Sequence, residues 1–277
     1  MAFERKGEQD QLERLGEQDI QQDIQFERLG EQDIQQDIQF ERLGEQGLLV
    51  RFGRRIDRAL QLMVLELDAR LREKPFAGMI ETVPAYASLA VYYDAWVVYR
   101  AAGGRGDRLP FELVCEHVRD LWASADGADV SVETRIVDIP VCYGGAYGPD
   151  LDAVAQHTRL TPEEVVRRHT AGEYAVYMIG FLPGFPYLGG LDERLATPRR
   201  GTPRLAVPAG SVGIAGAQTG VYPLESPGGW QLIGRTPLRL FRPEADSVSL
   251  LQAGDRVRFT AIGAAEFEAL AEGRPSS

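Results

Sequence analysis

The sequence has little cysteine and little histidine for its 277 residues. Its two cysteines, Cys115 and Cys142, do not form a CxxC pair. Two isolated thiols predict no disulfide framework and are typical of buried residues in a reducing compartment. The three histidines, His117, His157 and His169, lack the spacing of metal ligands. We therefore expect no bound zinc or other metal.

Several motifs of nucleotide-binding and hydrolytic proteins are absent too. The sequence contains no GxxxxGK[ST], no GxGxxG and no GxSxG, which argues against a P-loop, a dinucleotide fingerprint and a nucleophile elbow. No apolar run approaches the roughly 20 residues that cross a bilayer. No secretory signal pattern begins the chain. These absences predict a cytoplasmic protein without a membrane association. The lack of a basic stripe interleaved with aromatic residues argues against nucleic acid as a partner.

The net charge of −11 is concentrated near the N-terminus, where residues 1–46 hold 13 acids and 5 bases. This segment is a tandem repeat: Leu12–Gln25 reads LERLGEQDIQQDIQ, and Phe26–Gln39 repeats it with one change. A glycine in each copy and apolar residues at several angles do not fit a coiled coil. Residues 1–39 are therefore predicted to be an acidic, disordered low-complexity segment. The segment is either an interaction tail or a duplication without a role, and we prefer the second interpretation.

Residues 40–125 are predicted to form a small α+β domain. Apolar residues spaced i, i+3, i+4, i+7 over Asp57–Glu73 predict an amphipathic helix, and a second helix is expected over Pro110–Ala123. Strands are expected in three short runs: Gly47–Phe52, Met79–Val83 and Ser88–Tyr93. A linker at Ser124–Asp129 ends the domain. The domain contains no constellation of residues that suggests catalysis.

Residues 130–265 are predicted to form a β domain. From Tyr174 onward, glycine and proline recur between short apolar runs, which favours strands joined by tight turns. Two short helices are expected before this point, and Thr161 and Glu164 are predicted to cap the second one. The other expected elements are strands at Ser131–Val141 and Asp255–Thr260, helices at Pro149–Gln156 and Thr161–His169, and a helical turn at Glu266–Leu270.

Several sequence segments together resemble one known family. They are IPVCYGGAYGPDL, GFLPGFPYLGGL, TPRRGTPR and VPAGSVGIAGAQTGVYPLESPGGWQLIGRTPLRLF. They resemble the KipI/PxpB family, also called allophanate hydrolase subunit 1 or carboxyltransferase subdomain C/D. The resemblance runs from about Phe40 to about Ile262 and implies that the second domain is a cyclophilin-like β-barrel.

The resemblance implies a non-autonomous subunit of an ATP-dependent 5-oxoprolinase, which converts 5-oxoproline to glutamate. The implied partners are a complementary carboxyltransferase A/B subunit and a third 5-oxoprolinase subunit, and ATP would be shared with them. Two alternatives use the same motifs. One is a groove-binding inhibitor of a sensor histidine kinase, and the other is a carboxyltransferase-like module of urea or allophanate metabolism.

The arginines of TPRRGTPR are candidate ligand-binding residues. Guanidinium groups bind carboxylates and phosphates through paired hydrogen bonds. Arg200 is predicted to clamp such a group, and Arg204 is predicted to bind substrate or partner. Residue chemistry alone favours a solvated loop with surface ion pairs, and the resemblance makes the two interpretations even for Arg200.

Gln218, Thr219 and His169 complete the predicted reactive set. An amide and a hydroxyl between glycines could orient a carbonyl, although a polar β-turn fits the same sequence. His169 is a weaker candidate for proton transfer. A histidine at the end of a helix more often complements the helix dipole.

Aromatic residues could line an apolar groove for substrate or partner. Phe185, Tyr187 and Tyr222 are predicted to bind there, with Phe181 and Trp230 nearby. Core packing is the alternative interpretation. We expect at least one of Phe185 and Tyr187 to be exposed, because the surrounding glycines and prolines favour a loop.

Overall fold

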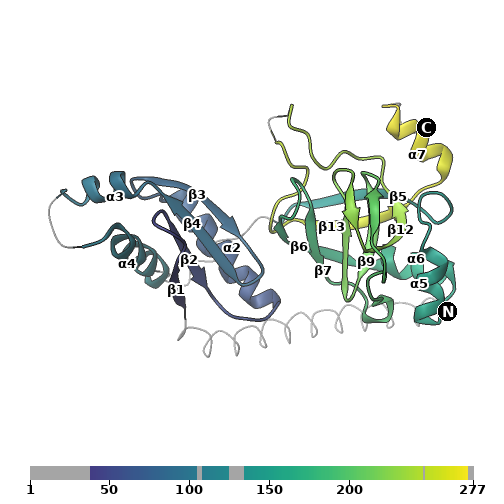
Figure 1. The fold of residues 1–277 in the computed structure, drawn as a ribbon, viewed down its shortest axis with the longest axis horizontal. Coiled ribbons are helices and arrows are strands. Elements are labelled where there is room, and N and C mark those ends of the chain that lie inside the picture. The colour runs from purple at the N-terminus through teal and green to yellow at the C-terminus, as the bar shows by residue number, and fades with distance from the viewer. Residues whose placement is uncertain (1–37, 105–107, 125–133, 246, 274–277) are drawn as a thin grey trace, which may run out of the picture. The chain divides into compact units, whose positions relative to one another are not determined.

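The computed structural model describes residues 38–104, 108–124, 134–245 and 247–273 (Figure 1). The chain divides into two compact units, Met1–Gly127 and Ala128–Ser277. Both combine helices with strands, so the predicted α+β class is confirmed. Residues 1–39 were predicted to be disordered, and residues 1–37 of them lie outside the described residues. The predicted linker, Ser124–Asp129, lies outside the described residues from position 125 onward.

The N-terminal unit contains a four-stranded antiparallel sheet in the order β1-β2-β4-β3. The strands are β1 (Gln39–Arg42), β2 (Gly47–Arg51), β3 (Met79–Pro84) and β4 (Ser88–Tyr93). The three predicted strands are confirmed. The edge strand β1 was not predicted. It begins at Gln39, the last residue of the second copy of the repeat, and Phe40 pairs with Val50 on β2.

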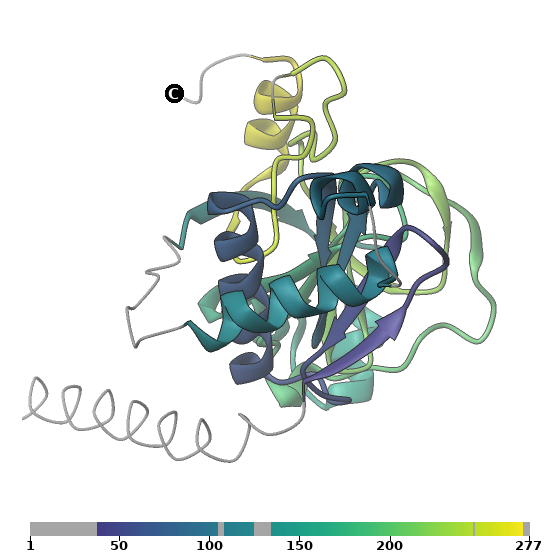
Figure 2. The same cartoon turned by 90° about the vertical axis from the view of Figure 1, so that its left-hand side faces the viewer.

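Among the described residues, three helices accompany this sheet. α2 (Arg58–Glu73) and α4 (Pro110–Ala123) lie over one face of the sheet (Figure 2), as the apolar spacing predicted. Asp57 caps α2 through its side chain. The short α3 (Ala95–Ala101) was not predicted. Asp94 caps it by accepting hydrogen bonds from two backbone N–H groups of its first turn.

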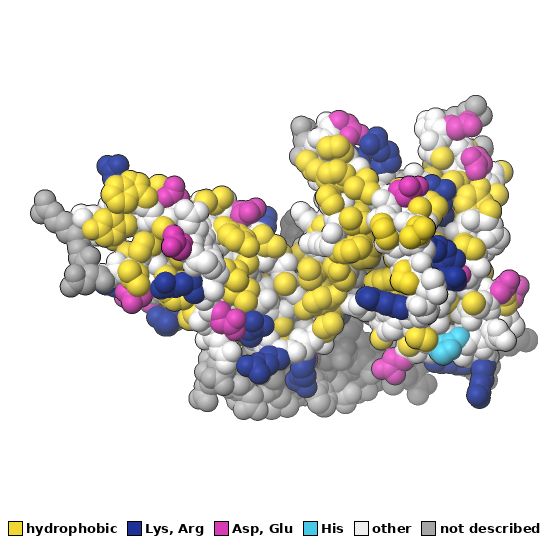
Figure 3. Space-filling view, in the orientation of Figure 1, with side chains coloured by type: hydrophobic (Ala, Val, Ile, Leu, Met, Phe, Trp, Pro, Cys, Tyr) yellow, Lys and Arg dark blue, Asp and Glu magenta, His cyan; other side chains and the backbone are white. Residues whose placement is uncertain are grey.

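Exposed apolar side chains gather at α3 and β3 in the N-terminal unit (Figure 3). Trp96 is 65% exposed and stacks on Tyr99 with ring centroids 5.8 Å apart. Val97 and Ile80 are exposed as well. Grouped exposed apolar residues often mark a contact for another molecule.

The C-terminal unit is built on a closed barrel in the strand order β10-β7-β6-β13-β5-β12-β9 (Figure 1). The strands are β5 (Ile136–Tyr143), β6 (Glu173–Ile179), β7 (Pro186–Gly189), β9 (Ser211–Ala215), β10 (Gln218–Val221), β12 (Gln231–Arg235) and β13 (Arg256–Ala261). The predicted final strand, β13, pairs in parallel with β5 and antiparallel with β6. It therefore joins the two ends of the unit's sequence and helps to close the barrel.

Two further strands, β8 (Arg204–Val207) and β11 (Ser226–Gly228), form a separate two-stranded sheet. The helices of this unit are α5 (Leu151–Thr158), α6 (Pro162–Ala171), α7 (Ala264–Ala271) and the 3₁₀ turn η1 (Glu193–Leu195). α5 and α6 confirm the two predicted helices. α7 is a complete helix where only a turn was expected.

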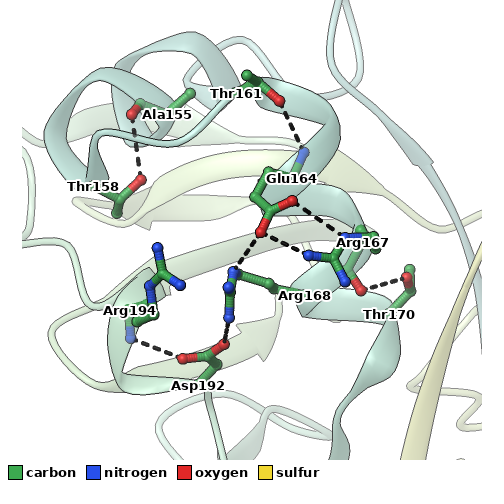
Figure 4. Close-up of polar contacts among 9 residues, drawn as sticks. All are labelled: Ala155, Thr158, Thr161, Glu164, Arg167, Arg168, Thr170, Asp192 and Arg194. Carbon is green, nitrogen blue, oxygen red and sulfur yellow. Dashed lines mark hydrogen bonds and ion pairs between the residues drawn. The ribbon is translucent and has the colours of Figure 1, made fainter.

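The start of α6 agrees only in part with the predicted capping box. The Thr161 hydroxyl accepts a hydrogen bond from the Glu164 backbone N–H at 3.2 Å. The Glu164 carboxylate does not return to the cap. It accepts hydrogen bonds from Arg167 and Arg168, and Arg168 also donates to Asp192 at 2.6 Å (Figure 4). This network ties the outer face of α6 to the loop that contains η1.

Candidate functional site

A pocket of about 670 Å³ opens in the C-terminal unit. Its walls combine aromatic residues with the glycine- and proline-rich segments around β8 and β11. The volume lies within the range of small-molecule sites, roughly 300–1,000 Å³. The pocket is therefore large enough for a metabolite or for a short segment of another chain.

The floor of the pocket is an aromatic cluster centred on Phe185. The ring centroid of Phe185 lies 5.2 Å from Tyr187, 5.5 Å from Tyr222 and 5.7 Å from Trp230, all in edge-to-face geometry. Such pairs add stability beyond simple area burial. The expectation that Phe185 or Tyr187 would be exposed is wrong: Phe185 is buried and Tyr187 is half-buried. The tight turn before β7 folds Phe185 onto the other rings.

Phe181 is instead the exposed aromatic residue of this loop, at 67% exposure, and it lines the pocket. Its φ is +69°, a left-handed conformation that is uncommon outside glycine. The neighbouring hydrogen bond from Leu182 N–H to the Gly180 carbonyl, at 2.9 Å, stabilises this turn. Backbone strain of this kind tends to occur at ligand-binding loops.

Arg200 and Arg204 meet beside the pocket on a buried carboxylate, Asp150. Arg200 Nη1 donates to Asp150 Oδ1 at 2.9 Å, and Arg204 Nη2 donates to the same oxygen at 2.8 Å. The other carboxylate oxygen, Oδ2, accepts from Leu232 N–H at 2.7 Å. Asp150 is only 4% exposed. The fold thus brings together the two arginines that were predicted to bind a ligand.

The electrostatics of Asp150 follow from this arrangement. Burial alone would raise its pKa. The hydrogen bonds from Arg204 and from the Leu232 backbone, with the positive charges of Arg204 and Arg200, outweigh that effect and lower the pKa of Asp150. The carboxylate is therefore ionised and holds both guanidinium groups at neutral pH.

His169 and Thr219 lie together in the barrel interior and do not line the pocket. Thr219 Oγ1 donates to the Gly213 carbonyl at 3.1 Å, so it must accept its 2.9 Å hydrogen bond from His169 Nε2–H. His169 Nδ1 then accepts from the Tyr143 hydroxyl at 2.8 Å. Both ring nitrogens are satisfied by one neutral tautomer.

This environment does not support the predicted proton-transfer role of His169. The side chain is fully buried, and burial lowers its pKa to about 3. It stacks on Phe259 with ring centroids 4.5 Å apart. At neutral pH the imidazole is thus an uncharged part of the barrel core without access to solvent.

The remaining candidates divide between the pocket and the strands. Tyr222 lines the pocket, and burial raises its pKa, opposed by the Trp230 backbone and the charges of Arg199 and Arg204. Gln218 is half-buried at the start of β10, paired with Ala215, and does not line the pocket.

Two residues of the site were missed from the sequence, Asp150 and Ser226. Asp150 lies in the IPVCYGGAYGPDL segment, which carried the resemblance but received no role. Ser226 is the first residue of β11 and lines the pocket. Neither residue stands in a motif whose spacing reveals its chemistry, so only the fold identifies them.

Among the described residues, no cluster of three or more histidine, cysteine or acidic side chains could hold a metal ion. In the same part of the chain, every helix is too short or too polar to cross a membrane. The cytoplasmic location stays a prediction.

Comparisons with known proteins give a consistent family. The family described as carboxyltransferase domain, subdomain C and D, matches residues 38–251. The chain is 51% identical to a 5-oxoprolinase subunit of Bacillus subtilis (strain 168), over 81% of this chain and 93% of that protein. It is 46% identical to the subunit of the same name in Escherichia coli O157:H7, over 73% of this chain and 85% of that protein.

Solved structures show the same fold. The chain aligns with TTHA0988 at a TM-score of 0.65 and 35% identity, over 78% of this chain and 40% of that one. This chain therefore spans well under half the length of TTHA0988. Urea amidolyase of K. lactis aligns at a TM-score of 0.65 and 18% identity, over 86% of this chain and 15% of that one, a likeness of fold alone.

Proposed function

Because the chain belongs to the family described as carboxyltransferase domain, subdomain C and D, we propose that it is a non-autonomous subunit of an ATP-dependent 5-oxoprolinase. The enzyme would convert 5-oxoproline to glutamate. The observation that carries the proposal is the high identity to two 5-oxoprolinase subunits over most of their length. The aromatic pocket with paired arginines beside it supports the same conclusion.

The chemistry of the substrate fits the aromatic pocket and the arginines beside it. 5-Oxoproline has a small lactam ring and a carboxylate. Tyr187 and Trp230 offer surfaces for the ring. Arg200, beside the pocket, would clamp an oxyanion of the reactants, either the carboxylate of 5-oxoproline or a phosphate of ATP. Activation of the lactam carbonyl by phosphoryl transfer, followed by ring opening, requires electrostatic stabilisation of developing charge more than a nucleophile on this chain.

Gln218 and Thr219 have a different place in the proposal. Thr219 fixes His169 in the barrel, and Gln218 begins the same strand. We assign both residues to support of the barrel that carries the pocket. Arg204, Tyr222 and Phe185 remain in the binding site, with Phe185 as its floor.

Partner chains are part of the proposal. The sequence lacks a P-loop, so we assign ATP binding to the assembly and not to this chain alone. A complementary carboxyltransferase A/B subunit and a third 5-oxoprolinase subunit would complete it. The exposed group of Trp96, Val97 and Ile80 supports a contact with another chain.

The test is reconstitution. The purified chain, alone and with its proposed partner subunits, is assayed for 5-oxoproline-dependent ATP hydrolysis and for glutamate. We expect turnover only in the full assembly. Robust turnover by the single chain overturns the subunit proposal. Capture of a histidine kinase helix by a chain that adds nothing to hydrolysis favours the inhibitor alternative.

A further inference from the structure

Three buried donor atoms beside the aromatic pocket have no hydrogen-bond partner among the described residues. They are Arg200 Nε, Arg204 Nη1 and Ser226 Oγ. Buried polar groups are nearly always paired, and an unpaired charged donor is costly. We propose that these groups form an oxyanion-binding wall of the pocket, with Asp150 as the positioning residue that holds the two guanidinium groups side by side. The proposal deepens the proposed function and rests on it for the identity of the ligand.

Ser226 lines the pocket, and backbone pairing places Arg204 and Arg200 directly beside residues that line it. Ser226 lines the pocket itself and is 7% exposed. Arg204 on β8 is the register partner of Gly228 on β11, which also lines it. The Arg200 backbone N–H donates to the carbonyl of Gly229, a third lining residue, at 2.7 Å. The three donor residues therefore belong to, or pair through their backbone with, one continuous strip of the pocket wall, residues 226–229.

The charge of this strip favours an anion. Arg200 and Arg204 carry two positive charges against the single negative charge of Asp150. Arg199 lines the pocket and is exposed, and adds a further positive charge. Guanidinium groups match the geometry of carboxylate and phosphate oxygens. The ligand thus presents an oxyanion to this wall and its apolar part to the aromatic floor.

Asp150 orients the donors without binding the ligand. Its Oδ1 accepts from both arginines, and its Oδ2 accepts from Leu232 N–H. Each guanidinium gives one terminal nitrogen to the carboxylate, which leaves Arg200 Nε and Arg204 Nη1 for another acceptor. Loss of the negative charge would let the two guanidinium groups repel each other and move apart.

The oxyanion has two possible sources in the proposed reaction, the carboxylate of 5-oxoproline and a phosphate of ATP. Steady-state kinetics of the assembled enzyme separate them. The variants are Ser226→Ala, Arg204→Lys and Asp150→Asn. Matched controls come from an exposed ion pair on the barrel, as Asp138→Asn and Arg258→Lys, whose side chains are about half exposed and joined at 2.9 Å.

Ser226→Ala and Arg204→Lys should raise one KM by roughly tenfold to a hundredfold, the scale of a lost hydrogen bond to a charged group. A rise in KM for 5-oxoproline identifies the carboxylate, and a rise in KM for ATP identifies the phosphate. Asp150→Asn should raise the same KM. The control variants should leave both values unchanged. If Ser226→Ala and Arg204→Lys fold normally and leave both KM values unchanged, the proposal is overturned.

A binding measurement keeps this inference separate from the proposed function. The wild-type chain and Ser226→Ala are titrated with 5-oxoproline and with inorganic phosphate, and ¹⁵N NMR shifts are followed. Weaker binding of either probe by Ser226→Ala supports the wall even if the assembly shows no 5-oxoproline-dependent hydrolysis, which would reject only the proposed function. Equal affinity of both chains, or no binding by either with unchanged KM values, rejects the wall.

Discussion

The barrel unit contains two buried polar clusters that differ in one respect. In the cluster of Tyr143, His169 and Thr219, one tautomer satisfies both nitrogens of the ring. In the cluster of Asp150, Arg200 and Arg204, donors remain without a partner in the described part of the chain. A complete buried network stabilises a fold, whereas an incomplete one is either a defect or a place for a ligand.

The two clusters show that residue type alone is a poor guide to which buried polar group has a functional role. Histidine is the residue most often chosen for proton transfer, yet here burial keeps it neutral. The arginine pair stands in a segment that residue chemistry alone would assign to a solvated loop. The two clusters differ in whether every hydrogen-bond donor has an acceptor, and the residue types alone do not reveal this difference. The predictions that follow test this distinction.

The largest expected effect on stability is from His169→Ala. The substitution removes a fully buried ring and leaves the Tyr143 hydroxyl and the Thr219 hydroxyl without their partner. Loss of such a ring should cost about 3–5 kcal/mol of unfolding free energy, measured by urea denaturation. His157→Ala on the exposed side of α5 is the control. A His169→Ala protein with unchanged stability and reduced turnover would instead support a proton-transfer role for His169.

Arg200→Ala should reduce activity strongly and stability only slightly, the opposite of what is expected for His169→Ala. Loss of the Arg200 contact to the oxyanion of the ligand should cost roughly 2–4 kcal/mol of substrate or transition-state binding in the assembled enzyme, the scale of a lost electrostatic donor. Asp150 keeps its hydrogen bonds from Arg204 and Leu232, so the loss of stability should be about 1 kcal/mol. Activity is measured beside thermal denaturation.

Arg200→Lys refines that result, because lysine keeps the charge and loses the planar fork. Partial recovery of activity is expected. Full recovery would show that a simple positive charge suffices. If activity survives Arg200→Ala with stability unchanged, Arg200 is a surface residue and the second cluster has no claim to the substrate.

The pH dependence of stability tests the neutral state of His169. Its pKa is about 3 in the folded chain and about 6.5 when unfolded. As pH falls below 6.5, the unfolded chain takes up a proton that the folded chain refuses, so stability falls, by up to about 1.4 kcal/mol per pH unit down to about pH 3. His169→Gln should lack this component. Equal slopes for both proteins between pH 6 and pH 4, roughly the window those pKa values define, would mean that His169 is not buried neutral.

Part of this architecture could be predicted from the sequence. The helix at α2 has apolar residues on one face and Asp57 as its cap, both local signals. The repeated glycine and proline after Tyr174 favour strands and turns. Those features depend on neighbouring residues, so a sequence reveals them.

The closure of the barrel and the composition of the site depend on distant residues. The parallel pairing of β13 with β5 joins Phe259 to Ile139, and the contact between Asp150 and Arg200 spans 50 positions. No periodicity encodes such contacts. For the same reason, the sequence could not place His169 in the barrel core, because its partner Thr219 lies 50 residues away.

Thr219→Val tests the complete cluster through a single hydroxyl. The substitution nearly preserves side-chain shape and leaves His169 Nε2–H without its acceptor in a fully buried site. Leaving a buried donor unpaired should cost about 1–3 kcal/mol of unfolding free energy. Denaturant titration measures it. A cost below about 0.5 kcal/mol, the ordinary scatter of surface substitutions, would mean that the His169 network does little to stabilise the barrel.

Ser226→Ala is the matched hydroxyl in the incomplete cluster, and its expected effect on stability is the smallest. The Ser226 hydroxyl is buried and has no hydrogen-bond partner among the described residues. Its removal breaks no internal bond and relieves an unpaired polar group, so the unfolding free energy should stay within about 0.5 kcal/mol or rise slightly. A loss of about 1 kcal/mol or more in the ligand-free chain would show that the hydroxyl has a structural partner. The changes in unfolding free energy caused by Thr219→Val and Ser226→Ala, measured under identical conditions, then show whether the two clusters differ. A large cost for Thr219→Val and none for Ser226→Ala would mean that the first buried hydroxyl is needed for the fold and the second is available to a ligand.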